Sequence, residues 1–531
     1  MTRETNRKGL TIGKAEYTKL LFALIFIGMV FIPLFRMFSN MDMDSVKRVV
    51  NSHSFSDAVV HSLVSALLGT LITVVLAFAL AMAVERSRIP CKGLFSIIFV
   101  LPMLIPSISH GMGLVILLGN NGILTKLFGL TSNIYGLGGI VVGSVLYAFP
   151  VAFLMLADVI HYEDGSAYEA ARVLGIPKHR QLTAITLPFL KKPLISVVFA
   201  VFTLIITDYG VPVMVGGKYT TVAAVMYQEV IGQMDYGKGA VYGTILLIPA
   251  VIAFVVDIVN KDRGNSGYVT KPCELSKSKI ANTLAFVFCI FIALLTMLPL
   301  VSFGTLAFAT DYPNNLTFTL ANLEKTFIRG AGEYYWNSVL IALVTAAVGT
   351  GIAFMTAYLS ARMKSRLSRF LHLSSMTSAA IPGMVLGLSY VMVFKTTPIY
   401  GTVIILVLVN VVHFIASPYL MIYNSMSKIN ENLEGVAHTM GIRRSQLIRD
   451  ILIPQCKFTL LEMFAYFFVN CMMTISAVSF LANTQNKPIS LMINQFADHM
   501  QLECAAVVSL MILVTNLAIK GIVHLLKSRK K

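Results

Sequence analysis

The chain has 531 residues, of which 56% are hydrophobic and only 13% are charged, a balance that a water-soluble domain of this length would hardly show. The net charge of +17 would suit a nucleic-acid-binding protein, but the lysines and arginines stand in short clusters between apolar runs. Composition and charge therefore argue against nucleic acid as a partner and predict an integral protein of the lipid bilayer.

Twelve segments are apolar over the roughly 20 residues that a helix needs to cross a bilayer. We therefore predict an all-α, polytopic membrane protein with about twelve transmembrane helices. Polar and small residues interrupt the third segment between Ser107 and Gly113, so we expect a kink there. The predicted spans are 20–39, 58–83, 94–118, 134–158, 192–214, 239–259, 280–305, 335–360, 369–393, 400–423, 458–480 and 500–525.

A polar segment at 260–279 separates the sixth span from the seventh. It contains glycines and Pro272 and has no periodic apolar pattern, which is typical of a flexible linker. The sequence therefore predicts two transmembrane domains, at 1–259 and 280–531.

The two domains carry matching motifs and form a duplication. Pro106 and Gly111 recur as Pro382 and Gly387, in each case 276 residues later. Each repeat holds six spans, an even number, so the repeats have parallel orientation and are related by an axis along the membrane normal. This arrangement predicts a central pathway between them.

The basic residues predict the orientation in the membrane, because positively charged short loops stay in the cytoplasm. Most of the 42 lysines and arginines fall in the two terminal tails, the linker and every second loop. We therefore predict a multi-pass membrane protein with both termini in the cytoplasm. The loops at 160–191 and 424–457 then face the cytoplasm as well.

The residues of the loop at 160–191 predict a helix, a sharp turn and a second helix. Glu169 suits the positive N-terminal end of a helix, Gly175 is a natural helix stop, and Pro177 suits the first turn of the next helix. The loop at 424–457 is an imperfect copy. The residues that carry this pattern are Glu169, Ala170, Ala171, Gly175 and Pro188 in the first loop and Glu434, Ala437, Gly441 and Pro454 in the second.

The order Glu169-Ala-Ala, Gly175, Ile185 and Leu187-Pro188 resembles the signature loop of the permeases of binding-protein-dependent ABC importers. The duplication is similar to the subset in which both permease domains are fused in one chain. The resemblance implies that the loops are coupling helices for two copies of a cytoplasmic ATPase, which the nine pattern residues would contact. It also implies a solute-binding protein on the other side of the membrane.

The second copy departs from this pattern. Gly435 stands where the signature acid would fall, Glu434 is displaced by one residue, and Val436 replaces the first alanine. We therefore predict that the first loop is the stricter coupler.

Motifs for chemistry within this chain are missing from the sequence. There is no GxxxxGK[ST] phosphate-binding loop, no HExxH and no GxSxG, and the six cysteines lack metal-ligand spacing. We expect no catalytic residue, no metal site, no cofactor and no enzymatic activity, so ATP hydrolysis would belong to a separate subunit.

Residues of the solute pathway are expected where polar groups or helix breakers interrupt an apolar span, because irregular backbone is tolerated in the membrane only facing protein or water. An acid within the membrane also costs free energy unless it faces water, a cation or a basic group. The candidates are Ser107, His110, Asp208, Tyr209 and Ser476.

The solute is indicated by resemblance alone. The stretch 208–212 with Gly216-Gly217 looks like the branch of fused permeases that serves 2-aminoethylphosphonate, and Ser476–Val478 is similar to that branch and to the ferric-iron branch. The implied function is import of a phosphonate by alternating access, with ferric iron, a polyamine such as spermidine, or thiamine as alternatives.

Two other classes of protein remain to be weighed. A secondary transporter driven by an ion gradient would also fit twelve duplicated spans, but the scarcity of acids within the spans and the two coupling-loop motifs argue against it. A membrane enzyme would need clustered catalytic groups, which the sequence does not contain.

Overall fold

The computed structural model describes residues 16–130, 134–260, 271, 273–312, 314–430 and 432–528. Within these residues, ten helices are long and apolar enough to cross a membrane, or up to twelve if each of two bent helix pairs forms one span. The prediction of an all-α, polytopic membrane protein is confirmed. The remaining part of the linker prediction, at 261–270 and 272, lies outside the described residues.

The first half contains only helices among its described residues. Their bounds are η1 Ile27–Phe31, α2 Ile32–Ser39, α3 Met43–Val50, α4 His53–Arg86, α5 Lys92–Val100, η2 Leu101–Leu104, α6 Ser107–Leu118, α7 Ile123–Phe128, α8 Leu137–His161, α9 Ser166–Val173, α10 Lys178–Gln181, η3 Leu182–Thr186, α11 Leu187–Ile206, α12 Gly210–Val215, α13 Val222–Tyr227, η4 Gln228–Gly232 and α14 Tyr236–Asn260.

The second half adds one short antiparallel hairpin to its helices. The bounds are α15 Lys279–Ala307, β1 Ala309–Asp311, β2 Asn315–Phe318, α16 Ala321–Ile328, α17 Ala331–Ala361, α18 Arg366–Thr377, η5 Ser378–Ala380, α19 Gly383–Phe394, α20 Val403–Phe414, α21 Ala416–Ser427, α22 Leu433–Thr439, α23 Arg444–Leu447, η6 Ile448–Leu452, α24 Ile453–Met473, α25 Ser490–Asp498 and α26 Leu502–Ser528.

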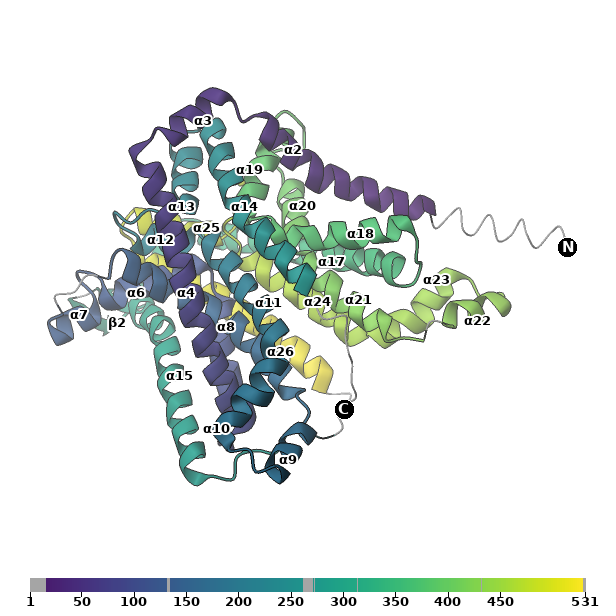
Figure 1. Cartoon of the computed structure of the whole chain (residues 1–531). Helices are drawn as coiled ribbons and strands as arrows, with labels where there is room; N and C mark the ends of the chain where they lie inside the picture. The colour runs from purple at the N-terminus through teal and green to yellow at the C-terminus, as the bar shows by residue number, and fades with distance from the viewer. Residues whose placement is uncertain are drawn as a thin grey trace.

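The helices form one elongated bundle. The two helix–turn–helix loops α9–α10 and α22–α23 lie at the same end of this bundle as the start of α15 and the end of α26, which we call the loop end (Figure 1). Helices α3 and α7 and the hairpin lie toward the opposite end. This placement is the one that the parallel repeat predicts for the two loops.

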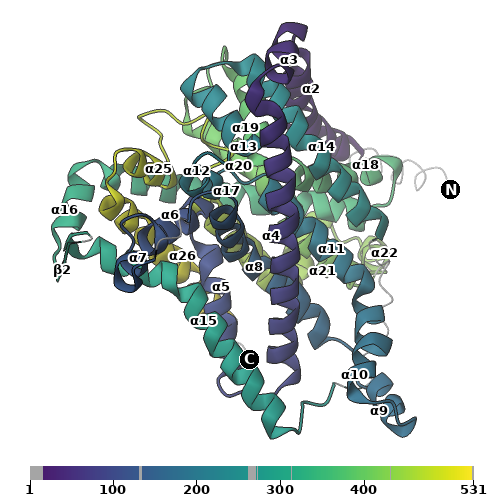
Figure 2. The ribbon, with the colours of Figure 1, turned by 60° about the vertical axis from the view of Figure 1, so that its left-hand side comes forward.

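The two halves interleave rather than lie side by side. In the first half, α2 packs on α19 and α14, whereas α15, the first long helix of the second half, packs on α4, α5 and α6. Helices α2 and α15 accordingly lie on opposite sides of the molecule (Figure 2). Each half therefore contributes its first helix to the packing of the other half.

Two helices end earlier than the spans predicted for them, at equivalent places in the two repeats. The span predicted at 192–214 is a helix that begins at Leu182 and ends at Ile206, and the span predicted at 458–480 ends at Met473. The segments that follow each break are apolar and buried, so hydropathy continues where the helix does not. The third span is broken at Pro106, and α6 then runs without a break from Ser107 to Leu118. The kink expected between Ser107 and Gly113 therefore lies just before this stretch.

Equivalent glycines allow the segments after these breaks to pack closely. A Cβ atom on Gly111 of α6 would lie 2.6 Å from the Cβ of Met214, and one on Gly387 of α19 would lie 2.6 Å from the carbonyl oxygen of Ala477. Both distances are shorter than a carbon atom tolerates, so any larger residue would push the segments apart. The duplication thus preserves a tight contact beside the middle of the bundle.

Candidate translocation cavity and coupling loops

The first predicted coupling loop folds as the helix–turn–helix that its punctuation predicts. Glu169 lies in the first turn of α9, and Gly175 follows the helix with a φ of +69°, a conformation that glycine adopts without strain. The amide of Ile176 donates to the carbonyl of Ala171 at 2.9 Å. Pro177 then begins α10 with extended backbone.

The second loop repeats this geometry despite its degenerate sequence. Glu434 lies in the first turn of α22, and Gly441 follows that helix, also with a φ of +69°. The amide of Ile442 donates to the carbonyl of Ala437 at 2.8 Å. The backbone of the two loops is therefore equivalent even though their signature acids are not.

The other predicted contact residues also fall on matching positions. Ala171 and Ala437 are the buried residues of the two short helices, and Pro188 and Pro454 stand in the first turns of α11 and α24. Ala170 is exposed on α9. The structure thus gathers all nine predicted residues into two equivalent loops at the loop end.

The described part of the linker lies against the first loop. Lys271 pairs with Glu169 at 3.1 Å, and Glu274 pairs with Arg172 at 3.0 Å. The amide of Gly165 donates to the carbonyl of Lys271 at 2.9 Å. The hydrogen bond from Arg172 holds the pKa of Glu274 below its usual value. Backbone and ionic contacts thus connect this part of the linker to the first loop.

A cavity of about 740 Å³ lies between the two halves. It is lined from the first half by η2, α6, α8, α11 and α14, and from the second half by η5, α20, α21 and α24. Three of the five predicted pathway residues line it, namely Ser107, Asp208 and Ser476.

Asp208 has a structural role as well as its place in the cavity wall. Its carboxylate accepts hydrogen bonds from the amides of Gly210 at 3.3 Å and Val211 at 3.0 Å. It therefore caps the positive N-terminal end of α12. This cap offsets part of the cost of an acid within the membrane.

The structure places the other two predicted residues behind the cavity wall. His110 is 1% exposed, and its ring centre lies 5.8 Å from that of Tyr147, which does line the cavity. Tyr209 is also 1% exposed; its ring stacks on Tyr227 at 4.7 Å, and its hydroxyl lies 2.9 Å from that of Ser479. Neither residue is among those that line the cavity.

Sequence reasoning missed most of the polar cavity lining. Tyr147 and His413 line the cavity from the two halves at positions 266 residues apart, which is the spacing of the two coupling loops. Tyr466, Asn470 and Asp257 also contribute. A comparison of equivalent positions in the fourth and tenth predicted spans would have found the first pair. Among the described residues that line the cavity, none is lysine or arginine.

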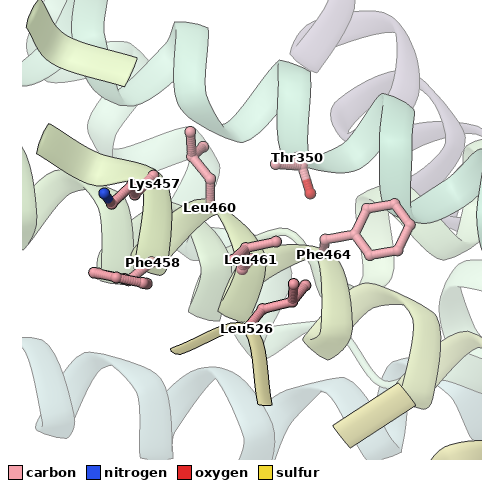
Figure 3. Close-up of a pocket in the computed structure, with 7 residues that line it drawn as sticks. All are labelled: Thr350, Lys457, Phe458, Leu460, Leu461, Phe464 and Leu526. Carbon is pink, nitrogen blue, oxygen red and sulfur yellow. The ribbon is translucent and has the colours of Figure 1, made fainter. Parts of the chain in front are cut away.

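A second, mostly apolar cleft lies in the second half alone. It has a volume of about 460 Å³ and is lined by residues of α17, α24 and α26. Figure 3 shows the hydroxyl of Thr350 directed toward the cleft and the amine of Lys457 at its edge. Because the first half contributes nothing to it, this cleft does not fit a pathway between the repeats.

Comparison with known proteins decides the family. A model of the family described as "binding-protein-dependent transport system inner membrane component" matches residues 69–261 and 349–531, one match in each repeat. The chain belongs to this family. The two matches together cover more than half of the chain, and each includes one of the two helix–turn–helix loops.

Relatives of this family member include permeases of two kinds. It is 25% identical over 431 residues to the ferric transport system permease protein FbpB of Actinobacillus pleuropneumoniae, covering 77% of this chain and 62% of that protein. It is 22% identical to the Fe(3+)-transport system permease protein FbpB 2 of Haemophilus influenzae, covering 82% and 83%. It is 23% identical to the thiamine transport system permease protein ThiP of Escherichia coli, covering 62% of each.

Proposed function

We propose that this chain is the membrane permease subunit of an ATP-driven importer in the bacterial cytoplasmic membrane. Its partners would be two copies of an ATPase at the loop end and a solute-binding protein at the opposite end. The observation that carries this proposal is the pair of equivalent helix–turn–helix loops at one end of a duplicated bundle. The loop end would then be cytoplasmic, together with both termini.

The mechanism follows from the position of the loops and the cavity. Closure of the ATPase pair would draw α9 and α22 together, and the repeats would rotate against each other around the cavity. The cavity would open alternately to the two sides of the membrane. Ser107, Asp208 and Ser476 would face the solute, whereas His110 and Tyr209 would support the wall.

We propose a cationic solute for this cavity, either ferric iron or a thiamine-like organic cation. Asp208 and Asp257 supply negative charge, and the described lining has no lysine or arginine, so an anion would meet repulsion without a compensating group. The rings of Tyr147 and Tyr466 could also contact a cation. The names of the relatives agree with this choice. The phosphonate predicted from the sequence remains an outcome of the test.

The test is uptake into vesicles that hold the chain, its ATPase and its binding protein. Ferric citrate, thiamine, spermidine and 2-aminoethylphosphonate are offered separately, with and without ATP. ATP-dependent uptake of ferric iron or thiamine supports the proposal. Uptake of 2-aminoethylphosphonate alone would reject the cationic solute, and uptake driven by an ion gradient without the ATPase would reject the importer.

Asp208→Asn sharpens this test. Asparagine caps a helix about as well as aspartate, so the variant removes the charge and keeps the cap on α12. We expect uptake of a cationic solute to fall about tenfold, the effect of losing a charged contact of about 1.4 kcal/mol. Unchanged uptake would remove Asp208 from the pathway.

A further inference from the structure

Two arginines occupy equivalent places next to the coupling loops. Arg86 is the last residue of α4, and Arg362 follows the last residue of α17. They are 276 residues apart, the spacing that relates Pro106 to Pro382. Their side chains are only 16% and 3% exposed. A buried guanidinium needs a partner for its charge, and both arginines find a carboxylate in the coupling loops.

The guanidinium of Arg362 contacts both a side chain and the backbone of the second loop. Its Nε donates to Oε1 of Glu434 at 2.7 Å, and its Nη2 donates to Oε2 at 2.5 Å. This two-pronged pairing is the strongest geometry available to an arginine and a carboxylate. The guanidinium also donates to the carbonyls of Ile429 at 2.6 Å and Asn430 at 2.7 Å.

Arg86 holds the first loop differently. Its Nη2 donates to Oε2 of Glu163, which lies ahead of α9 rather than in it. The hydroxyl of Tyr168, in α9, donates to Oε1 of Glu163 at 2.7 Å and lies 2.6 Å from the hydroxyl of Thr186. The first short helix is thus linked to its arginine through a tyrosine, and Glu169 remains on the surface.

The difference bears directly on the acid of each helix. Both oxygens of Glu434 are engaged by a buried arginine of the same chain. Glu169 instead pairs with Lys271, and these two side chains are 44% and 61% exposed. An exposed pair of this kind contributes little and exchanges readily with other partners. The acid of α9 is available to another protein, whereas the acid of α22 is committed within the chain.

We propose that Arg362 and Glu434 are positioning residues that fasten α22 to α17, so that Glu434 serves within the permease and not on the ATPase. This inference rests on the proposed function of the loops. It accounts for the displaced acid of the second loop: at position 434 the carboxylate lies against Arg362. The second coupling helix then moves as one body with a long helix of the bundle.

The test compares Glu434→Gln with Glu169→Gln in the complex of chain, ATPase and binding protein. Glutamine keeps the shape of the side chain and removes the charge. For Glu434→Gln we expect full retention of bound ATPase but about a tenfold rise in ATP hydrolysed per solute imported, since one charged hydrogen-bonded contact is lost. For Glu169→Gln we expect weaker ATPase binding instead.

A charge swap separates positioning from simple destabilisation. The double variant Arg362→Glu with Glu434→Arg should recover part of the lost coupling, whereas either single change should not. Hydrogen exchange of the full chain alone gives a second readout, because Glu434→Gln should speed exchange in 433–439, and Glu169→Gln should leave 166–173 unchanged.

Two results would overturn the inference. One is weaker ATPase binding in Glu434→Gln, which would place this acid on the partner. The other is unchanged exchange in 433–439 together with unchanged coupling. If the wild-type complex imports nothing with ATP, the proposed function fails, and the exchange experiment still decides whether Arg362 and Glu434 fasten α22.

Discussion

The two coupling loops share a backbone and differ in their attachments. In both, a short helix ends at a glycine with a φ of +69°, and a proline stands in the first turn of the long helix that follows. A buried arginine contacts each loop, but Arg86 pairs with Glu163 ahead of the first helix, whereas Arg362 pairs with Glu434 within the second helix. The acid of the first helix, Glu169, instead pairs with Lys271 of the linker at the surface. The duplication has therefore kept the backbone shape of the proposed docking loop, while the side chains that hold it have diverged.

This difference indicates which ion pairs of each loop can open. Exposed pairs such as Lys271–Glu169 are worth about 0 to 1 kcal/mol and are screened by salt. A pair with a buried arginine cannot be opened without leaving a desolvated charge behind. The acid of the first helix can thus exchange its partner, while the acid of the second helix is held within the chain. The predictions below test this contrast in order of expected effect.

The largest effect is expected from Glu163→Ala in the first loop. The Glu163 side chain is 2% exposed, and its removal leaves Arg86 buried without its carboxylate, at a cost of about 3 kcal/mol. Glu434→Ala should cost less, because Arg362 retains carbonyl acceptors on Ile429 and Asn430. Thermal unfolding of the purified chain in detergent measures both. Equal shifts in the two variants would mean that these carbonyl acceptors do not compensate Arg362 for the loss of its carboxylate.

The next effect should be the same in both loops. Gly175→Val and Gly441→Val place a β-branched residue at a φ of +69°, which costs about 1 to 2 kcal/mol of backbone strain. An added Cβ would meet nothing within 4 Å at either glycine, so strain is the whole effect.

Both valine variants should bind less ATPase in a co-purification assay. Gly175→Asn and Gly441→Asn are matched controls, since asparagine tolerates this conformation, and they should bind nearly normally. A defect confined to one of the two glycines would show that the loops do not dock alike.

The smallest effect concerns the linker. Cys273 is partly buried, and its thiol donates to the carbonyl of Glu163 at 3.3 Å, while burial raises its pKa. It should react with iodoacetamide more slowly than the exposed Cys91. High salt or Glu274→Gln should speed its reaction, because each weakens the ion pair with Arg172. Labelling quantified by mass spectrometry checks this, and an unchanged rate would mean that backbone contacts alone hold the linker.

Acidification should also weaken the ion pair between Arg172 and Glu274, as high salt does. The pKa of Glu274 is lowered by its hydrogen bond to Arg172, so the pair stabilises the docked linker above the pKa of the unfolded state. That stabilisation is lost as the pH falls through the lowered pKa of the folded state. Because the Glu274 side chain is 52% exposed, the change should be small beside that of Glu163→Ala.

Much of the site could be predicted wherever the signal is local. Gly175 and Gly441 predict their turns because few other residues adopt a positive φ. Asp208 is recognisable as an acid in an apolar run. The carboxylate partners of Arg86 and Arg362 lie more than 70 residues away in the sequence and follow no local pattern. His110 and Tyr209 failed as lining residues for the same reason, because polarity in a span does not reveal which neighbour covers it.

The sequence by itself determined the spans, the duplication and the two helix–turn–helix loops, because hydropathy, proline and glycine act on the residues next to them. The sequence did not predict where the fifth and eleventh spans end, because the apolar run continues past the break in each helix. Only the tertiary structure decided the exchange of α2 and α15 between the halves, the lining of the cavity, and the choice of Arg362 as the partner of Glu434. These depend on which distant segments meet, and burial fixes that only when the whole chain has packed.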